Sequence, residues 1–372
     1  MNSGEVFKGI NYKIIGVMPE NISGVEDNPD NVRDGYCFFA VNGEKYNGED
    51  FTAAAAENGA DVVVSEKPLN LTCCNVIVGN IRECMGAVCK NFYLGENPKI
   101  KITGVVGTNG KTSVCHVLYN IFSYAGKKSA YLGTLGGKIG EEETESELTT
   151  PGTVELYKFI GKAEKAGTEY LFMELSAHAI CQKRDYGLFY ESLIFTNCTE
   201  DHLDYFKTME EYAAVKKSAF DRRKCKYMII NSDDATGREI LNDNEGANVL
   251  TYGIYNPADV FAIDITERTD GLGFIVNLFD IIYEMSSPLI GLCNVYNLLA
   301  SLCFGALAGL KIHTLSGAVR KIGAISGRAE RIAELNNADI FLDYAHTPDG
   351  LKTTLRSMRK ICRGKLYCLF GC

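Results

Sequence analysis

The chain has 372 residues, of which 46% are hydrophobic and 23% are charged, an ordinary composition for a globular protein. At roughly 100–200 residues per domain, this length predicts two or three domains. The formal net charge of −9 argues against nucleic acid or an anionic membrane as a partner. Any anionic substrate must therefore be met by local lysine and arginine side chains.

Cysteine usage indicates a reducing compartment. The 14 cysteines are scattered, and none forms the C-x-x-C spacing that would suggest a zinc site. The N-terminal sequence MNSGEVFKGI lacks the basic and apolar regions of a signal peptide. We therefore expect reduced, mostly buried thiols in a cytoplasmic protein.

Residues 1–98 are predicted to form a small α/β domain that ends in a Gly/Pro-containing linker. Its elements are strands over 35–41 and 60–66, a helix over 51–59, a third apolar run from Asn75 and a helix over 81–93.

Residues 101–113, KITGVVGTNGKTS, combine a β-prone run, a glycine-rich turn and the start of a helical pattern. This layout is typical of a phosphate-binding loop, because backbone N–H groups at a helix N-terminus bind anionic oxygens. Gly107 and Gly110 let the backbone approach a ligand closely. Lys111 adds a positive charge, and the Thr112 hydroxyl suits Mg²⁺. The match to G-x-x-x-x-G-K-[ST] lacks the first glycine, but the segment still predicts a nucleotide site.

From residue 99 to 330, strands and helices alternate in the pattern of a parallel sheet. Residues 259–290 alternate apolar and polar side chains around a turn at Asp270-Gly271, which predicts an antiparallel appendage. The apolar stretch 291–310 approaches the length of a membrane span, but its polar residues favour a buried helix. Remaining predictions are strands over 127–136, 170–176, 192–198 and 226–233, and helices over 153–166, 209–220, 295–310 and 314–322.

Residues 331–372 are predicted to begin a third domain, with a strand over 338–345, a helix over 349–361 and a strand over 365–371. A single βαβ unit is too little for a stable domain of this type. We therefore expect that the chain is truncated at Cys372.

Chemically active side chains follow the predicted strands of the central domain. Glu174 ends a buried strand, and His202 follows the next strand beside Asp201 and Asp204. Carboxyl ends of parallel strands meet at one edge, where open α/β sheets bind ligands. With Thr112, these groups could bind Mg²⁺ or Mn²⁺. A structural role for His202 remains an alternative.

Three other segments have both an ordinary and a functional interpretation. One threonine of Thr149-Thr150-Pro151 could cap the following helix, with Pro151 at its first position. The loop 182–184, Gln-Lys-Arg, could be a solvated surface or an anion clamp. Lys216 and Lys217 are by default helix-surface lysines.

Several motifs occur in the order and spacing of the Mur ligase family, and the chain resembles its MurE type, the UDP-N-acetylmuramoyl-tripeptide synthetases. They are GTNGKTS, LTTP, MELSAHAICQKR, FTNCTEDHLDYFKTMEEYAAVK, GLCNVYNLLA, SGRAERI and DYAHTPDGL. The resemblance implies an α/β fold of three domains and ATP-dependent amide ligation in peptidoglycan precursor synthesis. Residues 1–98 would bind the UDP-sugar, 99–330 would be a P-loop parallel-sheet domain, and 331–372 would be the first βαβ of an incomplete Rossmann-like domain.

The resemblance also implies roles for individual residues. ATP would be held by Gly107, Thr108, Asn109, Gly110, Lys111, Thr112, Ser113, Asn297, Arg328, Asp343 and His346. The UDP-MurNAc-dipeptide would contact Glu44, Lys45, Tyr46, Thr149, Thr150, Ser176, Gln182 and Arg184. Both substrates and the added amino acid are small molecules, and a monomer is expected.

The implied catalytic residues are Lys111, Glu174, His202 and Lys216. Thr112, Glu174 and His202 would surround one Mg²⁺, and Lys216 matches a lysine that CO₂ converts to a carbamate ligand for a second Mg²⁺. The D-Glu γ-carboxylate would attack ATP to give an acyl phosphate and ADP. The amine of meso-diaminopimelate or L-lysine would then displace phosphate, with domain closure excluding water.

The chain departs from the family pattern in three places. One is that the third domain is missing past Cys372, so we expect the 372 residues alone to be inactive and the added amino acid to be set by residues beyond them. Ala177 stands where a second serine is usual, and 28–30, Asn-Pro-Asp, replace the uridine-binding Asp-Ser-Arg. Proline removes a donor and aspartate reverses a charge. Two alternatives therefore stay open: a folylpolyglutamate-synthase-like ligase and a non-catalytic nucleotide-binding paralogue.

Overall fold

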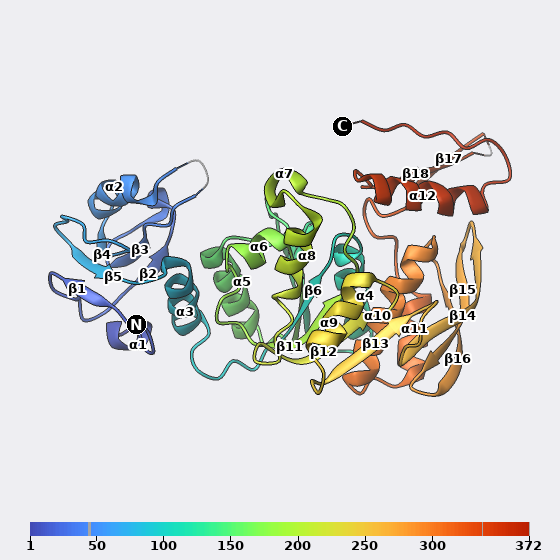
Figure 1. Ribbon diagram of the computed structural model, residues 1–372, viewed down its shortest axis with the longest axis horizontal. Helices are drawn as coiled ribbons and strands as arrows, with labels where there is room; N and C mark the ends of the chain where they lie inside the picture. The colour runs from blue at the N-terminus through green and yellow to red at the C-terminus, as the bar shows by residue number, and fades with distance from the viewer. Residues whose placement is uncertain (44–45, 337, 372) are drawn as a thin grey trace. The chain divides into compact units, whose positions relative to one another are not determined.

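The computed structural model describes residues 1–43, 46–336 and 338–371 (Figure 1). The described chain forms two compact units. The first contains 1–99 together with 151–166 and 178–188, and the second contains the rest.

The first unit is built on a five-stranded sheet of order β1-β5-β4-β3-β2, in which only β1 is antiparallel to its neighbour. Its strands are β1 (Lys13–Ile15), β2 (Gly24–Glu26), β3 (Tyr36–Phe39), β4 (Ala60–Ser65) and β5 (Cys74–Ile77). Its helices are α1 (Ser3–Val6), α2 (Thr52–Glu57), α3 (Ile81–Tyr93) and α5 (Thr153–Lys165), with 3₁₀ turns η1 (Pro29–Asn31) and η2 (Gly48–Phe51). The predicted strands and helices of this region are confirmed.

Helix α5 belongs to this first unit, although in sequence it lies between strands of the second. The Tyr157 hydroxyl on α5 donates to the Tyr186 carbonyl at 2.7 Å. The residue that caps α5 is Gly152, so the expectation that a threonine caps it with Pro151 at its first position is wrong. The Thr150 hydroxyl is instead bonded to backbone atoms of the second unit, as described below.

The second unit contains an eleven-stranded sheet of order β16-β15-β14-β13-β12-β11-β6-β10-β7-β8-β9. Seven neighbouring strands from β14 to β7 run parallel, and antiparallel hairpins extend both edges. The strands are β6 (Lys101–Val106), β7 (Ser129–Gly133), β8 (Gly136–Ile139), β9 (Glu142–Thr144), β10 (Tyr170–Leu175), β11 (Tyr190–Phe195), β12 (Cys225–Asn231), β13 (Val249–Gly253), β14 (Val260–Arg268), β15 (Gly271–Leu278) and β16 (Ile281–Ser287). The predicted parallel sheet and its antiparallel appendage are confirmed.

The helices that accompany this sheet are α4 (Lys111–Tyr124), α7 (Leu203–Phe206), α8 (Met209–Lys217), α9 (Ala235–Asp243), α10 (Leu292–Leu307) and α11 (Ile312–Arg320). Helix α6 (Ala177–Cys181) begins in this unit, and its residues from His178 onward belong to the first unit. Helices α4 and α10 pack together in the main core, where the rings of Phe122 and Phe304 lie 5.5 Å apart. Asn294 and Ser301 on α10 are hydrogen-bonded to backbone carbonyls, so the prediction of a buried helix is confirmed. A search of the described residues finds no helix with the length and apolar character needed to cross a membrane.

The C-terminal segment differs from its prediction. Strands β17 (Glu330–Leu335) and β18 (Ala338–Leu342) form an antiparallel pair, followed by α12 (Pro348–Ile361). The strand predicted over 365–371 is wrong, because the described residues there adopt no strand and pair with none. Tyr367, Leu369 and Phe370 remain 82%, 101% and 67% exposed. A strand needs a neighbour for its backbone hydrogen bonds, and a β-prone sequence alone does not supply one.

Candidate active site

The glycine-rich loop between β6 and α4 fits tightly against neighbouring side chains. A Cβ at Gly107 would lie 1.8 Å from the Thr196 Oγ1 atom, and one at Gly110 would lie 2.6 Å from the Asn297 Oδ1 atom. Gly110 caps α4 with a φ of 89°, a conformation that glycine adopts without strain. Only glycine fits at these two positions, and the loop lies at the N-terminus of a 14-residue helix.

A second strand end anchors this loop. The backbone N–H of Thr108 donates to the Asn197 carbonyl at 2.9 Å, and that of Asn109 donates to the Asn197 side chain at 2.9 Å. Lys111 Nζ donates to the carbonyls of Gly107 and Thr108, at 2.9 and 2.8 Å. Burial lowers the pKa of Lys111. The loop, its lysine and the end of β11 therefore form one hydrogen-bonded assembly.

Glu174, near the end of β10, is 1% exposed and accepts four hydrogen bonds. Its Oε1 atom accepts from the Tyr131 hydroxyl and from the Thr134 backbone N–H, both at 2.8 Å. Its Oε2 atom accepts from the hydroxyls of Thr112, at 3.0 Å, and Thr134, at 3.2 Å. A buried carboxylate is costly unless it is hydrogen-bonded in this way. The sequence-predicted pair Glu174 and Thr112 is thus in direct contact.

Lys216 on α8 is fully buried. Its Nζ donates to the Thr108 hydroxyl at 2.6 Å and lies 3.8 Å from the centre of the Tyr212 ring. No carboxylate in the described part of the chain forms an ion pair with it. Burial lowers the pKa of Lys216 to about 7. The default interpretation of Lys216 as a surface lysine is wrong, whereas Lys217 is paired with Glu239 at the surface.

His202 lies beside the same tyrosine. It precedes α7 with a φ of 54°, and its ring centre lies 6.1 Å from that of Tyr212. Its Nε2 atom is 3.4 Å from an Asp201 carboxylate oxygen, whereas Asp204 is exposed. Among the residues that the structure describes, no group of three His, Cys, Asp or Glu side chains is arranged to hold a metal ion. His202 therefore lies beside Tyr212, whose ring packs against Lys216. Glu174 contacts the phosphate loop through Thr112.

The remaining nucleotide candidates of the second unit divide into two groups. Asn297 lies against the loop, and its amide donates to the Asn294 side chain at 2.9 Å. Arg328 donates to the Thr112 hydroxyl at 3.0 Å and stacks over the Tyr344 ring. The Asp343 carboxylate accepts from the backbone N–H groups of Ala329 and Ala345 and from the Thr354 hydroxyl. The His346 ring contacts Tyr344.

The substrate candidates lie in both units. In the second, the buried Thr150 hydroxyl donates to the Glu174 carbonyl at 2.8 Å and accepts from the Ser176 backbone N–H at 3.0 Å. Thr149 pairs with the Thr134 hydroxyl at 3.1 Å. These bonds fix both threonines beside the strand end that carries Glu174.

In the first unit, the guanidinium of Arg184 donates to the Gln182 side-chain oxygen, Oε1, at 3.1 and 2.9 Å. Tyr46 is exposed and packs edge-on against Phe51. Glu44 and Lys45 lie outside the described residues. The Asn28 side chain accepts from the Asp30 backbone N–H, so it caps the η1 turn.

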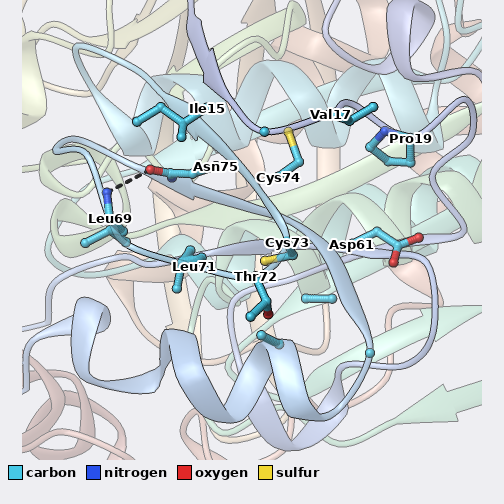
Figure 2. Close-up of a pocket in the computed structure, with 14 residues that line it drawn as sticks. Ile15, Val17, Pro19, Asp61, Leu69, Leu71, Thr72, Cys73, Cys74 and Asn75 are labelled. Carbon is cyan, nitrogen blue, oxygen red and sulfur yellow. Dashed lines mark hydrogen bonds between the residues drawn. The ribbon is translucent and has the colours of Figure 1, made fainter.

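An open groove of about 640 Å³ lies in the first unit, and none of the candidate site residues lines it. Figure 2 shows its walls, which include Cys73, Asp61 and Leu71. The Asn75 side chain accepts a hydrogen bond from the Leu69 backbone there, at 2.9 Å. The groove lies at the strand starts of β4 and β5, away from the strand ends where open α/β sheets bind ligands.

Sequence reasoning missed several residues that hold the candidates in place. Tyr131 and Thr134 bind Glu174, Tyr212 faces Lys216, and Asn197 anchors the loop. Thr134 and Asn197 follow the ends of β7 and β11, which was the available signal. Tyr131 and Tyr212 gave none, because an aromatic residue inside a strand or helix is usually a core residue.

Comparisons with known proteins identify related domains along the chain. The Mur ligase middle domain matches residues 105–305, the Mur ligase family catalytic domain matches 21–106, and the Mur ligase glutamate ligase domain matches 327–372. These matches cover most of the chain in three consecutive segments.

Full-length relatives agree with the domain matches. UDP-N-acetylmuramoyl-L-alanyl-D-glutamate–2,6-diaminopimelate ligase of Bacillus cereus is 33% identical, over 94% of this chain and 73% of its own length. Ligase 1 of that name from Clostridium acetobutylicum is 33% identical, over 100% of this chain and 78% of its own length. A solved structure of such a ligase superimposes with a TM-score of 0.85 at 28% identity, covering 100% of this chain and 77% of its own.

Proposed function

The chain belongs to the Mur ligase family, and we propose that it uses ATP to join meso-diaminopimelate to the D-Glu γ-carboxylate of UDP-MurNAc-L-Ala-D-Glu. The relatives at 33% identity carry this activity in their names. The observation that carries the proposal is the 3.0 Å contact between Thr112, which follows Lys111 on the phosphate loop, and the buried Glu174. Such a contact joins a phosphate-binding loop to an anionic oxygen ligand.

The reaction begins when the substrate carboxylate attacks the γ-phosphate of ATP, giving an acyl phosphate and ADP. Negative charge develops on the transferred group, and the Lys111 ammonium and the backbone N–H groups at the start of α4 would stabilise it. The amine of the diamino acid then attacks the acyl carbon and releases phosphate. Arg328 would contribute a second positive charge near Thr112.

The family implies Mg²⁺, and the donor set at Glu174 fits it. A hydroxyl and a carboxylate are the hard oxygen ligands that Mg²⁺ takes in phosphate sites. We assign Thr112, Glu174 and His202 to this ion. His202 lies beside Tyr212, the ring that faces Lys216. Bound there, Mg²⁺ would neutralise charge on the phosphates.

Lys216 fits a second ligand set only as a carbamate, because an ammonium repels a metal ion. CO₂ reacts with a neutral amine, and a lysine whose pKa is about 7 is substantially neutral at physiological pH. The resulting anion would replace a buried cation whose shortest hydrogen bond is to the neutral Thr108 hydroxyl, at 2.6 Å. Two Mg²⁺ ions and one CO₂-derived carbamate therefore complete the proposed site.

The remaining proposed contacts divide between substrate and nucleotide. Thr149, Thr150, Ser176, Gln182, Arg184 and Tyr46 are assigned to the muramyl dipeptide, and Asn297, Asp343 and His346 to the adenosine and phosphates. Thr150 is buried against Glu174, so this assignment puts the acceptor acid near the metal ligand.

The test is phosphate release by the full-length protein with ATP, UDP-MurNAc-L-Ala-D-Glu and meso-diaminopimelate. We expect release to require all three substrates and to fall by about a hundredfold or more in Lys111→Ala. L-Lysine in place of meso-diaminopimelate tests the choice of amino acid, and a folate substrate tests the folylpolyglutamate-type alternative. Phosphate release that is independent of the muramyl dipeptide would contradict the proposal.

A second candidate function is a nucleotide-binding paralogue that lacks ligase activity. It is favoured by residues 28–30, where the Asn28 side chain accepts from the Asp30 backbone N–H and the Asp30 side chain adds a negative charge. The adjacent Asp27 is also acidic. Burial raises its pKa most, and the negative charge of the neighbouring Glu26 raises it further. ATP binding without binding of UDP-MurNAc-L-Ala-D-Glu would favour this candidate.

A further inference from the structure

The Glu174 carboxylate has no free position for another ligand unless one of its four donors moves. Each carboxylate oxygen offers about two lone-pair directions, and both are used on each oxygen. The two oxygens are nevertheless held differently. Oε1 is bound by a backbone N–H and the hydroxyl of a buried tyrosine, whereas Oε2 is bound by two threonine hydroxyls, which rotate easily.

Tyr131 is fixed in its place. It lies on β7, is 3% exposed, and is paired in register with Phe172 on β10. Its ring also packs against His116 of α4, with ring centres 4.9 Å apart. A tyrosine hydroxyl is protonated at neutral pH, so it donates to Glu174 Oε1, at 2.8 Å.

Gly133 provides the space for this contact. A Cβ at Gly133 would lie 2.1 Å from Glu174 Oε1 and 2.6 Å from the Tyr131 hydroxyl. The backbone of β7 therefore approaches the carboxylate closely enough that any side chain at this position would separate the two groups.

We propose that Tyr131 is a positioning residue that fixes Glu174 Oε1, so that Oε2, beside Thr112, is the oxygen presented to the metal ion of the nucleotide site. This inference rests on the proposed function only in assigning Glu174 to the metal. It adds the residue that orients the carboxylate and the oxygen that faces the ion.

Loss of the Tyr131 hydroxyl could change Mg²⁺ binding in two opposite ways, through the basicity of the Glu174 carboxylate or through its orientation. A donor withdraws charge from the carboxylate, so basicity alone predicts that Tyr131→Phe binds Mg²⁺ more tightly. Loss of orientation predicts weaker binding, because the carboxylate turns away from Thr112. A hydrogen bond to a charged group contributes enough to shift an equilibrium by about tenfold, and the positioning role predicts a loss of that size.

The experiment is calorimetric titration of the full chain with ADP, once with Mg²⁺ and once with a chelator. The ratio of the two dissociation constants reports the metal contribution, and it needs no peptide substrate. We expect Tyr131→Phe to reduce this ratio by about tenfold and to leave metal-free ADP binding unchanged. Gly133→Ala, which displaces the same pair, is expected to reduce it similarly.

The matched control is Tyr252→Phe, since the buried Tyr252 hydroxyl donates to the Phe195 carbonyl at 3.0 Å and does not contact Glu174. It should keep the wild-type ratio. In a Glu174→Gln background, Tyr131→Phe should have no further effect. An unchanged or increased ratio in Tyr131→Phe, or a further loss in the Glu174→Gln background, would overturn the inference. Intact Mg²⁺ coupling without ligase activity would instead count against the proposed substrate alone.

Discussion

Two buried ionisable side chains contact the phosphate loop, and their surroundings are opposite. Glu174 reaches the loop through Thr112 and is surrounded by four hydrogen-bond donors. Lys216 reaches it through Thr108 and has a hydroxyl and an aromatic ring as partners. The first environment stabilises the charge of the side chain, and the second destabilises it.

This difference indicates that the two groups do different chemistry. A carboxylate held by donors is ready to act as an anionic ligand in its resting form. A buried lysine with a pKa of about 7 is ready to lose its proton and react. Replacing Glu174 or Lys216 removes one of these two groups, and the pH dependence of stability measures how strongly burial shifts the pKa of Lys216.

The largest effect is expected for Glu174→Gln. Glutamine keeps the shape but removes the negative charge, and its amide faces hydroxyl and N–H donors. We expect phosphate release to fall by about a hundredfold or more, with a higher Mg²⁺ requirement. The matched control is Glu169→Gln, an exposed carboxylate paired with Lys127, which should retain normal activity. Equal activities of the two variants would contradict the account.

Lys216→Met should have the next largest effect, because it keeps the bulk and removes the amine. Activity of the wild-type chain should fall in CO₂-depleted buffer and return with bicarbonate, whereas the variant should not respond. Because only the neutral amine reacts, this recovery should increase as the pH rises through about 7. ¹³C NMR with labelled bicarbonate should show a carbamate signal that is lost in the variant. A variant that still responds to bicarbonate would remove Lys216 from this role.

The same lysine predicts a dependence of stability on pH in CO₂-free buffer. Its pKa is about 7 in the folded chain, below the ordinary value of 10.5, so the unfolded chain binds more protons between these values. The free energy of unfolding should therefore rise with pH between about 7 and 10.5. Below pH 7 the lysine is protonated in both states, and the stabilisation gained from the neutral amine is lost. Thermal unfolding of the wild type and Lys216→Met should give Tm curves whose difference changes within this window. Parallel curves would mean that Lys216 is not neutral in the folded chain.

The smallest effect is expected for Tyr212→Phe. Its hydroxyl is 3.4 Å from the Thr108 Oγ1 atom, a long hydrogen bond, and phenylalanine keeps the ring that faces Lys216. We expect a loss of less than about fivefold in phosphate release. Tyr212→Leu removes the ring and should cost more. A large loss in the phenylalanine variant would show that the hydroxyl, and not the ring, holds the lysine.

The sequence predicted the elements around the phosphate loop because short-range patterns determine them. Strand, glycine turn and helix start at 101–113 form as expected, and Glu174 falls at the end of a buried strand. It could not predict that Lys216 is buried, since burial depends on how α8 packs against the loop. The Tyr131 contact likewise depends on the pairing of β7 with β10, two strands distant in sequence.

The C-terminal segment shows the opposite case. Residues 365–371 have the composition of a strand, but β propensity is realised only through pairing and packing with neighbours. Helix α5 was predicted correctly as a helix, but its packing with the first unit could not be read from its place in the chain. In both cases the missing information is tertiary.

The central claim is that the loop transfers phosphate from ATP to the acid of the muramyl dipeptide. Hydroxylamine tests it most directly, because this nucleophile captures an acyl phosphate as a stable hydroxamate in place of the diamino acid. With ATP, Mg²⁺ and UDP-MurNAc-L-Ala-D-Glu, we predict a hydroxamate that requires all three and disappears in Lys111→Ala. ATP consumption without any hydroxamate, or equal hydroxamate formation by the wild type and Lys111→Ala, would contradict the account.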